Sequence, residues 1–366
     1  MKSHYDYIIV GTGLFGSVFA CEMMKQGKTC LMIERRSHIG GNIYSETRDG
    51  INIHLYGAHI FHTSNERVWK YINELTTFNN YINSPIANYK GEYYNLPFNM
   101  NTFYAMWKAK TPKEVKDIIN EQRKEIKGEP ANLEEQAISL VGRDIFEKLI
   151  KGYTEKQWGK SCTELPSDII KRIPVRYTFD NNYFNHRYQG IPEGGYLPII
   201  EKLIEGADIL LDTDFNSDRE KYIRLGDKVL YTGPLDSLYD FCEGHLEYRS
   251  EEFEHKRFEE QNHQGVAVIN YTESDVPYTR SIEHKHFESQ ESPVTWVSYE
   301  YPVDYAKTGE PYYPLRDDKN LVLHDKYVKK ARTDESLLIG GRLAEYCYYD
   351  MDKTIASALD LVESLK

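Results

Sequence analysis

A glycine-rich turn near the start of the chain constrains the fold more than any other feature of the sequence. Residues 5–10, YDYIIV, form a short apolar run typical of a buried strand, and GTGLFG and the helix-like stretch SVFACEMMKQG follow directly. A second apolar run, KTCLMIE, ends on Glu34, eighteen residues after Gly16. A strand, a GxGxxG turn, a helix and a second strand ending on an acid predict a dinucleotide-binding unit.

Each part of this unit has a physical task. Gly11 allows the tight turn, Gly13 lets the backbone approach a pyrophosphate, and Gly16 lets the helix and strand pack closely. The N-terminus of the helix attracts phosphate groups, and Glu34 can bind ribose hydroxyls. A glycine turn alone would be weak evidence, but its flanks argue for a Rossmann-type domain of an α/β protein.

The next segment favours FAD over NAD. In ERRSHIGGN, residues 34–42, the acid is followed by a basic pair and by Gly40 and Gly41. This arrangement resembles the extended motif of flavoproteins of the glutathione-reductase type. Glu34 would then hold the adenosine ribose, and Arg35 would lie beside the adenine.

Proteins with such FAD domains return to the cofactor near the C-terminus, and this chain has a suitable segment. Residues 336–365 predict a strand, a glycine turn, a loop and an amphipathic helix with Asp350 or Asp352 as N-cap. The backbone N–H groups at the start of that helix would stabilise an anionic reduced flavin. A helix that only packs is the alternative.

The middle of the chain predicts two different substructures. Residues 102–158 are mainly helical, with a capping box at Thr111–Glu114, a second start at Asn132 and a third helix towards Tyr153. Residues 215–300 contain alternating stretches that indicate antiparallel strands. An inserted helical subdomain and a β-sheet subdomain are therefore expected.

Composition limits the function. The chain has 57 acidic and 45 basic residues, a net charge of −12, which disfavours nonspecific nucleic-acid binding. No apolar run approaches the roughly 18 residues of a membrane span. Five widely spaced cysteines and the lack of a signal-peptide layout indicate reduced thiols and a cytoplasmic protein. The 30 tyrosines, against 14 phenylalanines, suit clefts for polar ligands.

The sequence offers few candidate catalytic residues. His59 and His62 in YGAHIFHT are three residues apart, but the flanking pattern is not helical and no third ligand lies nearby, so no metal site is expected. They lie either beside the cofactor or in the core. No motif singles out a catalytic carboxylate pair.

The segment from 153 to 196 predicts a nucleoside diphosphate site. Arg172 and Arg176 lie in a loop bounded by prolines and flanked by Tyr153, Trp158 and Tyr183. Arginine pairs with phosphate and aromatic faces stack on bases. A solvated basic loop is the alternative.

Taken together, the motifs resemble bacterial UDP-galactopyranose mutases. The segments GTGLFG, YGAHIFHT, GYTEKQWG, IIKRIPVR, YFNHRYQGIPEGGY, GVAVINYT, VPYTRSIEHKHF, EPYYPL and GRLAEYCYYDMD follow in the family's order from end to end. The resemblance implies an FAD-dependent isomerase that interconverts UDP-galactopyranose and UDP-galactofuranose for cell-surface glycans. The N5 of reduced FAD would be the nucleophile at the anomeric carbon. A homodimer is also implied.

The resemblance also assigns roles to individual residues. Arg172 and Arg280 would stabilise the diphosphate, and His59 and His62 would lie by the flavin. The further substrate-binding positions are Asn83, Tyr153, Thr154, Trp158, Tyr183, Arg249, Asn270, Tyr313 and Tyr348. The further cofactor positions are Gly11, Gly13, Phe15, Gly16, Glu34, Arg35, Gly41, Asn42, Ile60, Asp214, Phe215, Arg342, Asp350, Met351 and Thr354. Spacing alone does not decide between Tyr312 and Tyr313, and Leu149 replaces an aromatic of the family.

The implied domains are discontinuous. Residues 1–80, 194–240 and 316–366 would form the FAD domain, and 98–160 the helical subdomain. Residues 81–97, 161–193 and 241–315 would form the β-sheet substrate subdomain, with a mobile arginine loop at about 164–177. Two rivals remain open: an amine-oxidase-like FAD oxidoreductase, and a flavin-containing binding protein without chemistry.

Overall fold

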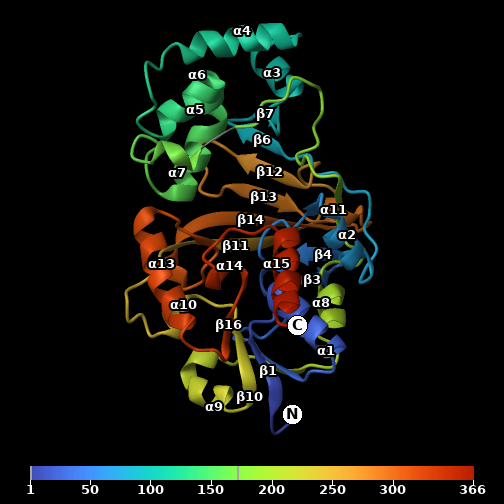
Figure 1. Cartoon of the computed structure of the whole chain (residues 1–366). Helices are drawn as coiled ribbons and strands as arrows, with labels where there is room; N and C mark the ends of the chain where they lie inside the picture. Colours follow the sequence, from blue (N-terminus) through green and yellow to red (C-terminus); the bar gives the residue numbers. More distant parts are fainter. Residues whose placement is uncertain (1, 171–172) are drawn as a thin grey trace.

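The computed structural model describes residues 2–170 and 173–366 and contains two large sheets (Figure 1). The first is a parallel five-stranded sheet in the order β16-β10-β1-β2-β9. Its strands are β1 (Tyr5–Val10), β2 (Cys30–Ile33), β9 (Asp208–Leu210), β10 (Gly226–Tyr231) and β16 (Leu337–Ile339). Helices α1 (Leu14–Lys25), α8 (Leu197–Leu203) and α15 (Met351–Ser364) share one apolar core with β1 and β2. The ends of the chain therefore meet in one Rossmann-type domain.

The second sheet has seven strands in the order β15-β11-β14-β13-β12-β6-β7. They are β6 (Ile86–Tyr89), β7 (Glu92–Asn95), β11 (Tyr248–Phe258), β12 (Val268–Tyr271), β13 (Arg280–Glu283), β14 (Thr295–Asp304) and β15 (Tyr313–Pro314). All neighbours are antiparallel except β6 and β12, which are parallel. In Figure 1 this sheet lies between the helical part and the parallel sheet.

The helical part follows β7. It contains α3 (Met100–Trp107), α4 (Pro112–Arg123), α5 (Leu133–Val141), α6 (Arg143–Ile145), a π-helical turn (Phe146–Lys151) and α7 (Gly152–Trp158). The predicted capping box forms at α4, where Thr111 and Glu114 each accept a hydrogen bond from the other's backbone N–H, and Asn132 caps α5. The expected third helix is confirmed as one continuous helical run over residues 143–158, in which a π-helical turn lies between α6 and α7.

Residues 215–300 differ in part from the expected antiparallel strands. From Tyr248 onward the strands join the second sheet, but β10 lies in the parallel sheet. Its flanks are helical: a 3₁₀ turn (Phe215–Asp218), α9 (Arg219–Ile223) and α10 (Leu235–Leu238). An alternating pattern of residues fits both kinds of sheet, so it could not tell them apart.

Short elements connect these parts. Strand β3 (Ser45–Arg48) pairs with β4 (Ile51–His54), and β5 (Phe61–Thr63) pairs with β8 (Tyr188–Gly190). The remaining elements are a 3₁₀ turn (Gly41–Ile43), α2 (Glu66–Asn73), a 3₁₀ turn (Ser167–Ile169), α11 (Lys285–Glu288), α12 (Tyr305–Thr308), α13 (Asp318–Ala331) and α14 (Gly341–Ala344). Among the described residues, no helix is both long and apolar enough to cross a membrane.

Candidate active site

The turn after β1 has the geometry that its glycines predict. Gly11 lies at φ +102°, and a Cβ there would sit 2.4 Å from Thr232 Oγ1. A Cβ on Gly16 would lie 2.3 Å from the Gly11 carbonyl oxygen, so glycine lets α1 approach β1. At Gly13, the residue before α1, a Cβ would meet nothing within 4 Å. This open space at a helix N-terminus fits a dinucleotide pyrophosphate. Gly41 borders it, since its Cβ would lie 3.0 Å from Gly13 Cα.

Glu34 is held beside this turn. Its side chain is buried, and Oε2 accepts hydrogen bonds from the Thr12 N–H at 3.0 Å and the Thr12 hydroxyl at 2.8 Å. Oε1 accepts one from the Arg36 N–H at 3.0 Å. Because a carboxylate offers about four lone-pair sites, Glu34 can still accept hydrogen bonds from ribose hydroxyls.

Two neighbouring arginines follow Glu34, and Arg35, the predicted one, is the more exposed of the two. Arg35 lies on the surface and pairs with Glu310 at 2.5 Å. Arg36, not predicted, is only 17% exposed, donates to Asn42 Oδ1 at 3.1 Å and lies 4.4 Å over the Tyr56 ring. Both arginines stand in the basic pair, so the signal was present, but the sequence does not show which one faces inward.

His59 lies between β4 and β5 with its ring beside the backbone of Asn42. Its Nε2 is buried and has no hydrogen-bond partner among the described residues. Burial lowers the pKa of His59 to about 4, and the nearby charges of Arg342 and Arg280 act in the same direction. The imidazole is therefore neutral at pH 7, and its unpartnered nitrogen fits a bound cofactor or substrate.

His62, on β5, is in a different environment. A 2.6 Å hydrogen bond joins its Nδ1 to the Nδ1 of His186, and its ring stacks on Phe184 with the centroids 3.7 Å apart. Burial lowers the pKa of His62. The spacing of His59 and His62 did not suggest His186 as a partner, because 124 residues separate it from His62.

The C-terminal segment returns to the glycine turn as expected. A Cβ on Gly340 would lie 2.3 Å from the Phe15 ring, so the two segments are in direct contact. Asp350 is the N-cap residue of α15, although its side chain makes no capping hydrogen bond; its carbonyl accepts from the Thr354 hydroxyl at 3.0 Å. Met351 is the first residue of the helix. The start of α15 thus resembles the start of α1 in lacking a side-chain cap.

Arg280 is the central cation of the second sheet. Its Nε and Nη2 donate to Oε1 of Glu300 at 2.9 and 2.6 Å, and Glu300 is 1% exposed. The register of β13 and β14 sets these two residues opposite each other. Glu300 was not predicted, although a glutamate within the apolar run VTWVSYEY signals a buried charge that needs a partner.

Arg342 lies on α14 beside two predicted tyrosines. Its guanidinium is 5.7 Å from the Tyr313 ring and 5.6 Å from the Tyr348 ring, and it donates to the Tyr312 carbonyl. Tyr313 faces the charges of Glu251 and Arg280, and burial raises its pKa well above the ordinary value. Tyr312 lies near Arg36 as well as Glu251. The structure therefore favours Tyr313 over Tyr312 as the residue beside Arg280.

The other predicted aromatic residues divide by burial. Tyr153, on α7, lies near Arg280, and burial raises its pKa. Trp158, at the end of α7, packs against the helical core, and Thr154 lies between them on the same helix. Tyr183 and Tyr348 are 44% and 55% exposed, so their hydroxyls are accessible to a ligand.

The structure describes two of the three remaining predicted arginines, and each of the two supports a neighbouring segment. Arg172 lies outside the described residues. Arg176 donates to the Asn182 and Tyr183 carbonyls and so fastens the loop that carries Tyr183. Arg249, on β11, donates from Nε to the Gln157 carbonyl at 2.9 Å, at the C-terminal end of α7. A cation there stabilises the helix terminus, so Arg249 supports α7.

Two asparagines present unpaired oxygens. The Oδ1 atoms of Asn83 and Asn270 are buried and have no partner in the described part of the chain. Asn270 stands opposite Arg280 in the pairing of β12 and β13, and the Asn83 carbonyl accepts from the Tyr183 N–H at 2.8 Å. Buried amide oxygens without partners fit the hydroxyl groups of a sugar.

Three predicted cofactor positions also make contacts within the protein. Ile60 belongs to a small apolar cluster, and Phe215 packs against Tyr222 and Tyr231. Asp214 accepts from the Asn216 N–H at 2.9 Å and caps the 3₁₀ turn. Their predicted contacts with a cofactor stay predictions.

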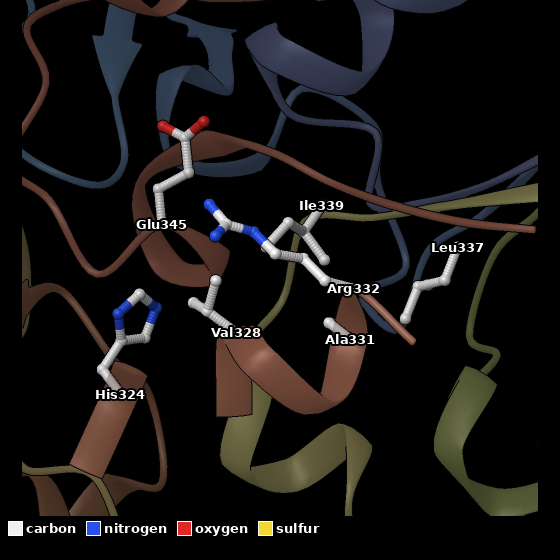
Figure 2. A pocket seen from close by; sticks show the side chains of 7 residues that line it. All are labelled: His324, Val328, Ala331, Arg332, Leu337, Ile339 and Glu345. Atoms are coloured by element: carbon white, nitrogen blue, oxygen red, sulfur yellow. The ribbon is translucent and has the colours of Figure 1, made fainter. Parts of the chain in front are cut away.

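A surface hollow of about 340 Å³ lies elsewhere, between α13 and the end of β16 (Figure 2). Its lining residues are His324, Val328, Ala331, Arg332, Leu337, Ile339 and Glu345. None of them is a predicted site residue. The candidate site therefore consists of the glycine turn, His59 and the Arg280 region rather than this hollow.

Known proteins resemble this chain in sequence. The family profile described as UDP-galactopyranose mutase matches residues 148–348, and the profile described as NAD(P)-binding Rossmann-like domain matches residues 9–75. The chain is 42% identical to a probable UDP-galactopyranose mutase of Klebsiella pneumoniae, over 97% of this chain and 93% of the relative. It is 37% identical to a dTDP-fucopyranose mutase of Escherichia coli, over 97% of each chain.

The fold has a close counterpart among solved structures. A crystal structure of reduced UDP-galactopyranose mutase superposes with a TM-score of 0.75 at 14% identity, covering 99% of this chain and 95% of that one. At this identity the match supports the two-sheet fold.

Proposed function

The chain belongs to the UDP-galactopyranose mutase family, and from that premise we propose that it interconverts UDP-galactopyranose and UDP-galactofuranose with reduced FAD as cofactor. The observation that carries the proposal is the position of His59. Its ring lies beside Asn42, next to the glycine turn, and within range of the Arg280 and Arg342 charges. A dinucleotide on the glycine turn and an anion at Arg280 would thus meet at His59.

The residues fit FAD. The open space at Gly13 would take the pyrophosphate, Glu34 the ribose, and the uncapped start of α15 the ring system. When bound, reduced FAD supplies the nucleophile of the ring contraction, its N5. His59 remains neutral at pH 7, so it contributes a hydrogen bond and not a charge.

The protein's own contribution is positioning and charge. Arg280, and by prediction Arg172, would bind the diphosphate and stabilise the negative charge that develops as the bond to the anomeric carbon breaks. The unpaired oxygens of Asn83 and Asn270 would accept hydrogen bonds from sugar hydroxyls and hold that carbon in place. This division of labour needs no catalytic carboxylate dyad. The homodimer, the cytoplasmic location and the mobile loop also remain predictions.

The decisive experiment uses the purified protein loaded with FAD and reduced by dithionite. UDP-galactofuranose is added, and the nucleotide sugars are separated by chromatography. Conversion to UDP-galactopyranose by the reduced protein alone, without net flavin oxidation, is expected. Oxygen consumption coupled to substrate loss would instead identify an oxidoreductase, and UDP binding without conversion a binding protein.

A parallel assay addresses the substrate. Because one relative is named for dTDP-fucopyranose, the furanose form of dTDP-fucose is offered at the same concentration. A kcat/KM for the UDP sugar at least tenfold above that for the dTDP sugar is expected. The reverse ratio would contradict the proposed substrate and leave the ring contraction in place.

A further inference from the structure

Two buried carboxyl groups lie together beneath Arg280. Glu251, on β11, is 8% exposed, and Glu300, on β14, is 1% exposed. The strand register pairs Glu251 with Pro302 and Phe253 with Glu300. Glu251 and Glu300 are therefore diagonal neighbours on the same face of the sheet. Two ionised carboxylates at this separation in a buried site would repel each other strongly.

The hydrogen bonds of Glu300 make it the direct partner of Arg280. Both donated bonds from Arg280 end on Oε1. Oε2 is equally buried but has no hydrogen-bond partner in residues 2–170 and 173–366. Arginine is always protonated, so Glu300 is its carboxylate partner. A buried carboxylate oxygen without a donor is costly, and the site needs one more proton to satisfy it.

Glu251 can supply that proton. Among the described residues, the Tyr313 hydroxyl is the one that donates to the Glu251 side chain, and its distance of 3.5 Å from Oε2 is too long for a strong hydrogen bond. Burial raises the pKa of Glu251 well above its ordinary value, and the neighbouring Glu300 raises it further, although Arg280 and Arg342 oppose the shift. A protonated Glu251 has an O–H to donate at the point where Glu300 lacks a donor.

The groups that face Glu251 come from several elements. They are Glu300 on β14, Arg280 on β13, Tyr313 on β15, Tyr312 before β15, Tyr153 on α7 and Arg342 on α14. Burial raises the pKa of all three tyrosines, so they are neutral at pH 7. The net charge of this group therefore depends on the two arginines and the two carboxyl groups.

We propose that Glu251 is a positioning residue that carries one proton and donates it in a hydrogen bond to Oε2 of Glu300, which fixes the Arg280 guanidinium in place. The proton leaves two cations and one anion at this end of the site. If Glu251 were ionised, the two arginines and the two carboxylates would have a net charge of zero. The site would then attract a diphosphate less strongly. The proposal rests on the proposed function in one respect, that the anion bound here is the diphosphate of UDP.

The test uses FAD-loaded protein and three variants. Glu251→Gln keeps a hydrogen-bond donor and cannot ionise. Glu251→Leu keeps an apolar side chain of similar size without the donor. Glu252→Gln is the matched control, since Glu252 is an exposed neighbour on the same strand. UDP affinity is measured by titration calorimetry at pH 7, and infrared spectra of the ligand-free proteins record the carbonyl stretch of a protonated carboxyl.

The expected result has two parts. The infrared band of the protonated Glu251 carboxyl is expected in the wild type and in Glu252→Gln. It is expected to be absent from Glu251→Gln. Glu251→Gln binds UDP within about threefold of the wild type, whereas Glu251→Leu binds about tenfold or more weakly, because Oε2 of Glu300 then lacks a donor.

Two results would overturn the proposal. One is a wild-type protein without the infrared band. The other is Glu251→Gln binding UDP at least tenfold more tightly than both the wild type and Glu252→Gln, since removal of a true negative charge would strengthen anion binding. A protein that shows the band but binds no UDP would contradict the proposed function and support the proton pair.

Discussion

The two sheets of the molecule prepare their parts of the site in opposite ways. In the parallel sheet the site is made from consecutive residues, Gly11 to Gly16, and consists of backbone and open space. In the seven-stranded sheet it consists of charged side chains from different strands, such as Arg280 on β13 and Glu300 on β14. The glycine turn binds its ligand through shape, and the seven-stranded sheet binds through charged side chains that are paired with opposite charges. A substitution should therefore damage the first by adding atoms and the second by removing a partner.

The largest expected effect comes from adding one methyl group to the glycine turn at two positions. Gly16→Ala places a Cβ 2.3 Å from a backbone oxygen, so the unit should misfold or lose most of its stability. Gly13→Ala has room for its Cβ and a φ of −65°, so the protein should fold normally. Its methyl group would nevertheless occupy the space expected for the pyrophosphate, and flavin content should fall at least tenfold.

The measurements are thermal unfolding and the flavin-to-protein ratio from absorbance. Asn120→Ala serves as a control, since Asn120 is an exposed residue of α4 in the helical part, outside this site. Full flavin content in Gly13→Ala would show that the pyrophosphate is not bound at this turn.

The second effect breaks the charged half. Arg280→Ala should lower kcat/KM by about 10² to 10³, because the side chain expected to donate hydrogen bonds to the diphosphate is lost. It should also destabilise the fold by about 3 kcal/mol, since Glu300 would keep a buried charge without its cation.

A double variant separates the two consequences. Arg280→Ala with Glu300→Gln should regain most of the stability in urea unfolding but none of the activity. Recovery of activity in the double variant would mean that Arg280 acts only by neutralising Glu300. Flavin content should remain unchanged in both, which distinguishes this half of the site from the glycine turn.

The same contrast explains what the sequence could predict. The glycine turn and the position of Glu34 were predictable because each depends on neighbours within about 20 residues. The C-terminal return to Phe15 was predictable only through the resemblance to FAD domains. In contrast, the pair His62–His186 joins residues 124 positions apart, and the pair Arg280–Glu300 depends on the exact register of β13 and β14, which one sequence does not reveal. The contact of Arg35 with the adenine stays a prediction, and the sequence gives no sign that Arg36 is the one whose side chain turns inward there.

The third effect concerns another buried charge of the seven-stranded sheet, on a residue that is not a predicted site residue. Glu283 is fully buried on β13; burial alone would raise its pKa, but His286 and the backbone N–H groups of His263 and Gln264 lower it to about 2. Its ordinary value is 4.5, so the carboxylate stabilises the fold above that pH, and this contribution is lost as the pH falls through about 2.

Glu283→Gln should therefore lower the free energy of unfolding by about 3 kcal/mol at neutral pH. The difference from the wild type should shrink progressively below about pH 5. Urea unfolding across this range measures it, with Glu252→Gln as the exposed control. If the difference in unfolding free energy between Glu283→Gln and the wild type did not change with pH, Glu283 would stabilise the fold through its shape and not through its charge.

The smallest effect comes from a cap that the sequence predicted in full. Thr111 accepts from the Glu114 N–H at 3.3 Å, and Glu114 accepts from the Thr111 N–H at 3.2 Å. Thr111→Ala should cost about 1 kcal/mol, because the first turn of α4 loses one satisfied donor. Because these contacts are local and exposed, faster hydrogen exchange should be confined to the start of α4. Glu114→Ala should have a similar effect, and the double variant should cost less than the sum of the two, since each residue completes the other's hydrogen bond. Faster exchange throughout the seven-stranded sheet would instead show that α4 is coupled to the charged half of the site.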